Sequence, residues 1–207
     1  MDIMRSSKLY ANYSSNIRQA KYEEKPWDSY LVKDFKLWMK HKRLEEQDYF
    51  CCYCLRCIKN ESDRVKHIEH ILPKSKFPAY MFDAFNLSVS CVKCNCDIKL
   101  SGTDFLNDQM LGFRKSWSYR VYDSKLYRFI HPKLDNINDY LTRELKSINN
   151  RPSYVYKYFG DKGKFHYDFF RLKEFEVFDI NSSQGLTSPA PSSEAASIVA
   201  AIYKKHT

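Results

Sequence analysis

The sequence predicts an α+β fold built around one small unit, in which two short strands are followed by a helix. The first observation behind this prediction is a Cys-x2-Cys pair, Cys51 and Cys54, that precedes two strand-like segments. The second is another such pair, Cys91 and Cys94, that follows them after 36 residues. Two pairs at such a distance are typical of a closed, structural zinc site with four thiolate ligands. The third is a cluster of histidine and acidic residues between the pairs, which indicates chemistry beside the zinc.

Length and composition limit the class of protein. The chain has 207 residues, which allows one domain with appendages, and 43% of them are hydrophobic, enough for a sizeable core. Only 5 residues are glycine, and no glycine-rich phosphate-binding motif occurs, which argues against a nucleotide-binding fold. The net charge of +9 favours a polyanionic partner, above all nucleic acid, over the alternative that the charge serves only solubility.

Hydropathy and cysteine usage lead to an expectation about the compartment. Residues 1–15 are polar, and no segment approaches the ~18 apolar residues of a membrane span. We therefore expect no secretion signal, no membrane partner and a cytoplasmic, reducing location. In such a location the 7 cysteines are expected to bind metal rather than to form disulfides.

The N-terminal part is predicted to hold one long helix. Residues 1–27 are polar and irregular, and we expect a loosely held arm that packs on the rest and has room for a short helix. Residues 28–47 are predicted to be helical, with Asp28 as the N-cap. The lysines of this helix either contact a phosphate backbone or form a solvated face, and the sequence favours neither. Its apolar residues recur at helical spacing: Leu31, Phe35, Trp38 and Met39.

Two overlapping cysteine pairs compete for the first half of the zinc site. We favour Cys51 with Cys54 over Cys54 with Cys57. Three cysteines are then spare, namely Cys52, Cys57 and Cys96. A free cysteine is usually a small buried hydrophobic residue, so we assign these no role.

The segment between the cysteine pairs predicts two strands. Residues 65–72 are rich in Val and Ile, and Pro73 favours a strand end there because it has no N–H to donate. Residues 74–85 are expected to be a loop, 86–90 a second strand and 95–100 the start of a helix. Strand, loop, strand and helix, held together by zinc, form a ββα unit.

The following segments predict a mixed extension. We expect a short helix over 104–111, a strand over 119–130 and a helix over 138–148. Residues 153–180 contain two aromatic-rich segments, YVYKYF and KFHYDFF, around a turn with two glycines, which predicts a hairpin.

The predicted elements divide the chain into four parts. Residues 181–193 are rich in serine and proline and are expected to be a linker, and 194–206 are expected to be an amphipathic helix. The parts are an N-terminal arm and helix (1–47), the zinc-closed core (48–112), a mixed extension (113–180), and the linker with its helix (181–207).

The zinc-closed segment holds residues that suit phosphodiester hydrolysis: Glu69, His70, Asn86 and Asn95. The Glu69 carboxylate and the Asn95 amide offer oxygen ligands, which a hard cation such as Mg²⁺ prefers. A neutral imidazole can take a proton from an attacking water near pH 7. Because Glu69 and His70 are neighbours, they would face opposite ways in a regular strand, so they can serve one phosphate only where the strand ends.

These motifs resemble those of the HNH endonucleases of the ββα-metal class. The resemblance covers about 50 residues strongly and extends weakly to about residue 140. The strings HIEHILPKS and FIHPKLDNINDYL are also similar to the HNH subunit of Septu-type antiphage systems. The motifs are Cys51-x-Tyr53-Cys54, Glu69-His70-Ile71-x-Pro73-Lys74, Asn86-Leu87 and Cys91-x2-Cys94-Asn95.

The resemblance implies a role for each residue. It makes His70 the general base and Glu69 and Asn95 the ligands of a catalytic Mg²⁺ or Mn²⁺, while Asn86 fixes the loop and orients the histidine. The four cysteines would bind the structural zinc. The resemblance implies a nucleic-acid substrate, DNA before RNA, and the subfamily implies an ATPase partner in antiphage defence.

Two departures from the family pattern matter. The acidic residue before the base is commonly Asp, and Glu69 is one methylene longer. Family members commonly read Cys-Asn-x2-Lys, whereas Lys99 follows Asn95 after three residues. This puts Lys99 in doubt as a phosphate contact. Lys74 and Lys76 are further candidate nucleic-acid contacts, with a solvated loop as the alternative.

Other readings stay open from the sequence. His67 shares a strand face with Glu69 and could be a metal ligand, although a structural role is favoured. For His131 and Asp135 we favour a structural role, with a supporting role behind the site as the alternative. Two rival functions are a non-catalytic zinc module that binds nucleic acid or protein, and a zinc-ribbon adaptor whose aromatic C-terminal half docks a partner.

Overall fold

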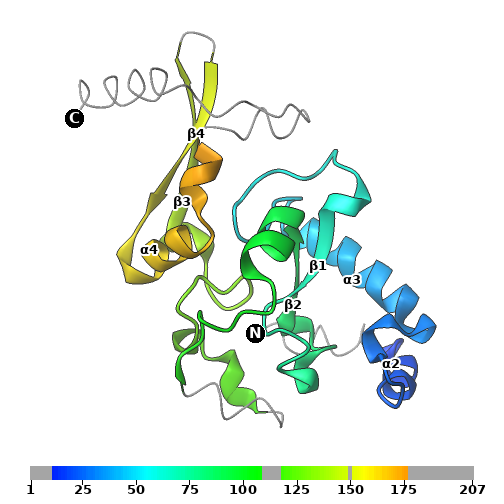
Figure 1. The fold of residues 1–207 in the computed structure, drawn as a ribbon. Helices are drawn as coiled ribbons and strands as arrows, with labels where there is room; N and C mark the ends of the chain where they lie inside the picture. The colour runs from blue at the N-terminus through cyan, green and yellow to red at the C-terminus, as the bar shows by residue number, and fades with distance from the viewer. Residues whose placement is uncertain (1–10, 109–117, 149–150, 177–207) are drawn as a thin grey trace.

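The computed structural model describes residues 11–108, 118–148 and 151–176, and Figure 1 shows how their elements are arranged. The predicted mixture of helix and sheet is confirmed. No helix in this part of the chain combines the length and the apolar character that a membrane span needs. The longer helices are α2 (Ser14–Ala20), α3 (Lys33–Glu46), a π-helix (Lys93–Lys99) and α4 (Gly160–Phe169), and the strands are β1 (Lys66–His70), β2 (Leu87–Cys91), β3 (Leu141–Ile148) and β4 (Arg151–Tyr158).

The two central strands lie close to where the sequence predicts them, over 65–72 and 86–90. They form an antiparallel pair, β1 with β2, and the chain runs from β2 into the π-helix. Helix α3 packs on this pair (Figure 1). The buried guanidinium of Arg43 in α3 donates from Nε to the Leu87 carbonyl at 2.9 Å. A buried charge needs such partners, so Arg43 fixes the helix on the sheet.

The N-terminal helices enclose an apolar cluster on one side of the sheet. Phe35 and Met39 of α3 are buried together with Phe82 from the loop and Leu87 from β2. Ile17 of α2 completes the cluster, so the predicted arm contains a short helix that packs.

The sequence predicts Asp28 as the N-cap of the first long helix, and this prediction is wrong. Two 3₁₀ turns, Pro26–Asp28 and Tyr30–Val32, precede the helix, which begins at Lys33. The backbone is extended at Ser29, between the turns, and its hydroxyl caps the second turn.

The C-terminal half differs from the prediction in its pairing. Residues 138–148, predicted to be helical, consist mainly of β3, and residues 164–170, predicted as a strand, lie mainly in α4. Strand β4 pairs with β3, with Leu141 opposite Tyr158, and not with the segment after Gly160. The predicted hairpin is thus wrong, although its first strand exists.

Helical spacing explains why α4 forms where a strand was predicted. His166 and Phe170 stand four residues apart and are both fully buried. Phe165 and Phe169 repeat this spacing, and their rings stack at 5.7 Å between centroids. Side chains four residues apart lie on one helix face, so the helix places the rings of each pair side by side.

Two further predictions fail between the core and β3. Residues 119–130, predicted as a strand, contain two 3₁₀ turns, Tyr119–Tyr122 and Ser124–Leu126. Residues 104–107 of the helix predicted over 104–111 are not helical and include an isolated bridge from Leu106 to Tyr127. The linker and terminal helix predicted over 181–206 lie outside the described residues.

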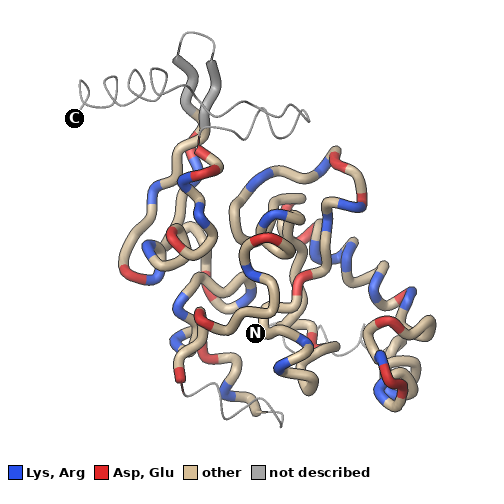
Figure 2. The backbone as a smooth tube through the Cα atoms, viewed as in Figure 1, with Lys and Arg blue, Asp and Glu red and all other residues tan. Residues whose placement is uncertain are grey.

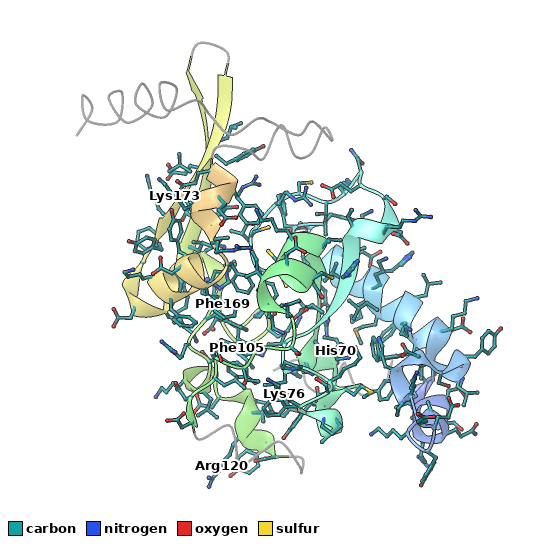
Figure 3. The ribbon with its side chains drawn as sticks, in the orientation of Figure 1. His70, Lys76, Phe105, Arg120, Phe169 and Lys173 are labelled. Atoms are coloured by element: carbon teal, nitrogen blue, oxygen red, sulfur yellow. The ribbon has the colours of Figure 1, made fainter. Side chains whose placement is uncertain are left out.

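The main core joins the first cysteine pair to the C-terminal half. The Tyr53 ring stacks on Phe170 at 4.2 Å, and Phe105 stacks on Phe129 at 4.3 Å. Figure 3 shows Phe105 and Phe169 on the side of the molecule that α4 covers, and their rings meet edge-on at 5.9 Å. The segment between Cys51 and Cys54 is therefore packed from behind by aromatic residues.

Candidate metal centre and active site

Four cysteine side chains form a compact buried cluster. The sulfurs of Cys51, Cys54, Cys91 and Cys94 all lie within 4.8 Å of one another, and all four residues are fully buried. The backbone N–H of Cys91 donates to the Cys51 sulfur at 3.3 Å. Four thiols at such distances can hold a metal ion such as zinc.

The electrostatics of the cluster fit a cation. Burial raises the pKa of the Cys54 thiol well above its usual value, and the neighbouring Cys51 raises it further. Four buried thiolates would therefore repel one another without a positive charge among them. A metal ion supplies that charge and keeps all four deprotonated.

The structure decides between the competing cysteine pairs. Cys57 is exposed and lies outside the cluster, so the pairing of Cys51 with Cys54 is confirmed. Cys52 is buried, as expected of a spare cysteine, whereas Cys96 is exposed. Its sulfur lies 3.3 Å from Nδ1 of His67, a contact that the sequence did not indicate.

Glu69 on β1 is the centre of a buried polar network. Its carboxylate oxygen Oε1 accepts from the Tyr53 hydroxyl at 3.0 Å and pairs with Lys99 Nζ at 2.6 Å. Its other oxygen, Oε2, accepts from Nδ2 of Asn95 at 2.5 Å. Burial raises the pKa of Glu69, and the Lys99 ammonium opposes that shift. The network thus brings together Glu69 and Asn95, as the sequence predicted, and adds Tyr53.

Asn95 and Lys99 reach Glu69 from the π-helix Lys93–Lys99. This helix closes with a hydrogen bond from the N–H of Leu100 to the Asn95 carbonyl at 2.9 Å, which spans five residues. Leu100 itself has φ of 50°, so the helix ends abruptly. Short π-helical turns are rare and occur often at functional sites.

His70 lies at the end of β1 on the other side of the sheet. Its Nε2 faces the Met81 carbonyl at 3.0 Å, and its ring packs edge-on against Trp27 at 4.3 Å. Burial lowers the pKa of His70 to about 3, and the charges of Lys74, Lys99 and Lys36 contribute. The imidazole is therefore neutral at pH 7. If Nε2 donates to Met81, then Nδ1 keeps its lone pair.

Asn86 fixes the loop that follows His70. Its Oδ1 accepts from the N–H of Leu72 at 2.6 Å, and its Nδ2 donates to the carbonyls of Leu72 and Tyr80, both at 3.0 Å. Tyr80 precedes Met81, whose carbonyl meets His70. Asn86 thus holds the loop directly and reaches the imidazole only through Met81.

Glu69 and His70 have different neighbours, as strand alternation predicts. Glu69 meets the polar network, whereas His70 meets Trp27 and Met81. They are linked through the backbone, because Lys99 Nζ also donates to the His70 carbonyl at 2.9 Å. The strand ends at His70, one residue after Glu69.

The three lysines predicted to contact nucleic acid differ in exposure. Lys76 is exposed, Lys74 is half-buried, and Lys99 is buried in the pair with Glu69. Figure 3 places Lys76 near His70. The buried pair with Glu69 holds the Lys99 ammonium inside the protein, so a contact of Lys99 with nucleic acid stays a prediction.

Two further histidines, His67 and His131, have structural partners. His67 shares the Glu69 face of β1, and its Nε2 lies 2.9 Å from the Arg64 carbonyl. His131 is 2% exposed, and its Nδ1 accepts from the N–H of Lys133 at 3.1 Å. Asp135 accepts from the N–H of His131 at 2.7 Å. These contacts agree with the structural role favoured for His131 and Asp135.

Sequence reasoning missed Tyr53 and Trp27 as neighbours of the site. Tyr53 has a local signal, because it stands between Cys51 and Cys54, but nothing in the sequence indicates that its hydroxyl reaches β1. Trp27 lies far from His70 along the chain and meets it only through the packing of the N-terminal segment.

Comparison with models of protein families, with curated proteins and with solved structures found no match for this chain. The class of site therefore rests on the geometry itself. It consists of a buried four-cysteine cluster that can hold a metal ion, beside a strand end with a buried carboxylate and a neutral histidine.

Proposed function

We propose that the chain is a metal-dependent HNH-type endonuclease that hydrolyses phosphodiester bonds of nucleic acid. The observation that carries the proposal is the meeting of Glu69 with Asn95 at 2.5 Å, one residue before His70 at the end of β1. All three stand at the positions that the HNH motif implies. Zinc in the four-cysteine cluster would hold the two ends of this unit together.

The residues around Glu69 fit a hard divalent cation such as Mg²⁺ or Mn²⁺. Oε2 of Glu69 faces Asn95, and a half-turn of the Asn95 amide would present its oxygen there instead of its nitrogen. Mg²⁺ keeps several waters and needs only one or two protein oxygens. When bound, the ion would stabilise the negative charge that develops on the phosphate.

The chain's own residues would move the proton. His70 would accept it at Nδ1 from a water whose oxygen attacks phosphorus, while the bond from phosphorus to the leaving oxygen breaks. The Met81 carbonyl holds Nε2, and Trp27 fixes the plane of the ring. Asn86 keeps the intervening loop in place.

A basic surface beside His70 supports nucleic acid as the substrate. Figure 2 shows Lys and Arg along α3. Lys36 of this helix lies over the Trp27 ring at 5.3 Å, and Trp27 contacts His70. Lys74 and Lys76 follow directly after β1. These charges attract the phosphates of DNA and RNA alike. The preference for DNA therefore rests on the family resemblance alone.

The Septu resemblance adds two expectations to the proposal, an ATPase partner and a role in phage defence. Co-purification of an ATPase with the tagged chain would test the first. A cytoplasmic location follows from the cysteine usage and is part of the same proposal.

The test is cleavage of plasmid DNA and of total RNA with Mg²⁺ or Mn²⁺. We expect His70→Ala to reduce the rate by ~10²–10⁴, the usual contribution of a general base, with zinc content unchanged. His41→Ala supplies the matched control, because His41 is exposed on α3. Equal cutting by wild type and His70→Ala would contradict the proposal.

A protein that binds nucleic acid without cutting it, even together with any co-purified ATPase, would instead be the non-catalytic zinc module. In that case His70→Ala should leave binding unchanged, and Cys94→Ser should abolish it.

A further inference from the structure

Two donors on the same carboxylate oxygen have no part in the proton transfer described above. We propose that Lys99 and Tyr53 are positioning residues, which hold Glu69 Oε1 and so turn Oε2, the partner of the Asn95 amide, toward a metal ion beside Asn95. The inference rests on the proposed function, since it concerns the same carboxylate.

Lys99 and Glu69 form a buried ion pair. The side chains of Lys99 and Glu69 are only 1% and 4% exposed. The Lys99 ammonium lies over the Phe105 ring at 5.3 Å and donates to Glu69 and to the His70 carbonyl. A charge enclosed in this way has no solvent to move into, and removing one partner of such a pair leaves the other uncompensated. Lys99 therefore serves Glu69 rather than a phosphate.

The two oxygens of the Glu69 carboxylate have different partners. Oε1 has both buried donors, the Tyr53 hydroxyl at 3.0 Å and the Lys99 ammonium at 2.6 Å. Oε2 has the amide of Asn95, which is half-buried. Beyond Asn95 the next side chain, Cys96, is exposed. Oε2 thus has the less buried partner of the two oxygens, and the proposal places the metal ion on its side.

The two donors, Tyr53 and Lys99, come from chain segments that contain the clustered cysteines. Tyr53 stands between Cys51 and Cys54, and Lys99 lies on the helix that contains Cys94. The four-cysteine cluster draws these segments together, so the two donors converge on one oxygen. His166 completes the support, because its Nε2 lies 2.8 Å from the Tyr53 carbonyl.

The π-helix Lys93–Lys99 explains how Asn95 and Lys99 both reach Glu69. Hydrogen bonds that span five residues turn the chain less per residue than those of an α-helix. A residue four positions after Asn95 then lies nearly where the residue three positions after it would lie in an α-helix. The π-turn thereby absorbs the extra residue in Asn95-x3-Lys99, and both side chains reach Glu69.

The experiment measures Mn²⁺ binding to the zinc-loaded full chain by electron paramagnetic resonance, without substrate. Loss of binding in Glu69→Gln identifies the site. We expect Lys99→Met and Tyr53→Phe each to weaken Mn²⁺ binding by ~10–100-fold, as removal of residues that orient metal ligands does. Lys93→Met is the matched control, since Lys93 lies on the same helix but pairs with Glu174 at the surface.

Folding is checked by circular dichroism and zinc content. Tyr53→Phe removes one hydroxyl only, so it keeps the test informative if Lys99→Met does not fold. Because both residues act through Oε1, the double variant should lose less than the product of the two single effects.

The outcomes separate the two proposals. Unchanged Mn²⁺ affinity in the folded variants would overturn the positioning role, and so would tighter binding by Lys99→Met, which would make the ammonium a competitor of the metal. Absence of any Mn²⁺ site that depends on Glu69 would overturn it too. Wild type that binds Mn²⁺ but cuts nothing would contradict the nuclease proposal alone.

Discussion

The two sides of the β1–β2 sheet hold their functional groups by different means. On one side, three polar side chains fix Glu69, and the four-cysteine cluster and the aromatic core support them. On the other side, His70 has one hydrogen bond to a backbone carbonyl and a ring contact with Trp27, within the apolar packing of α3.

The difference matches what each group would have to do. A carboxylate that receives an ion gains from being held still before the ion arrives, so both of its oxygens have partners. A base must keep one nitrogen free, and His70 is held through the other nitrogen and through an edge-on ring contact with Trp27. The comparison therefore predicts that substitutions on the Glu69 side reduce stability and metal binding. Substitutions on the His70 side should reduce the cleavage rate.

The largest effect should come from breaking the cysteine cluster. Cys94→Ser removes one of four buried ligands, and zinc binding contributes an apparent ~10–16 kcal/mol in zinc-finger peptides. We expect zinc loss and no cooperative thermal unfolding, measured by zinc analysis and calorimetry. Cys57→Ser is the matched control, because Cys57 is exposed and outside the cluster. A fully stable Cys94→Ser protein would show that the cluster needs no metal.

An intermediate effect is expected at Asn86, between the two sides. Asn86→Asp places a carboxylate against the Leu72 and Tyr80 carbonyls, to which the amide donates at 3.0 Å. We expect a loss of about 3 kcal/mol in the free energy of unfolding, since buried acceptors lose their donor. Urea denaturation would measure it. Asn16→Asp, at an exposed position, should change stability little; a similar loss in both would disprove the specific role of Asn86.

The smallest effect should come from Trp27, on the His70 side. Trp27→Leu removes the edge-on ring contact with His70, and such contacts contribute about 0.5–1.5 kcal/mol. We expect the cleavage rate to fall several-fold while zinc content stays unchanged. Trp38→Leu is the control, because Trp38 packs on Tyr13 and Phe35 and does not meet the histidine. Equal rate losses in both variants would mean that Trp27 acts only through stability.

The elements that the sequence predicts well are those held by local chemistry. The pairing of Cys51 with Cys54 and the two central strands are confirmed. Their signals lie in short spacings, which the geometry of metal ligands and the strand-breaking effect of Pro73 dictate. The meeting of Glu69 with Asn95 follows from the same motif.

The C-terminal half was predicted poorly because its choices depend on distant partners. Residues 141–148 form a strand because β4 lies beside them. Residues 164–169 are helical, and the buried ring of Tyr53 offers a surface to Phe170 at the end of that helix. Short aromatic segments suit either structure, so their own pattern cannot decide.

The sequence by itself determined the cysteine cluster and the strand pair, and it singled out the residues that we propose to carry the chemistry. Only the tertiary structure decided what surrounds them: Trp27 against His70, and Tyr53 with Lys99 on one oxygen of Glu69. The physical reason is the separation along the chain over which each effect acts. Ligand spacing acts within a few residues, whereas burial and charge compensation depend on which distant side chains fold against each other.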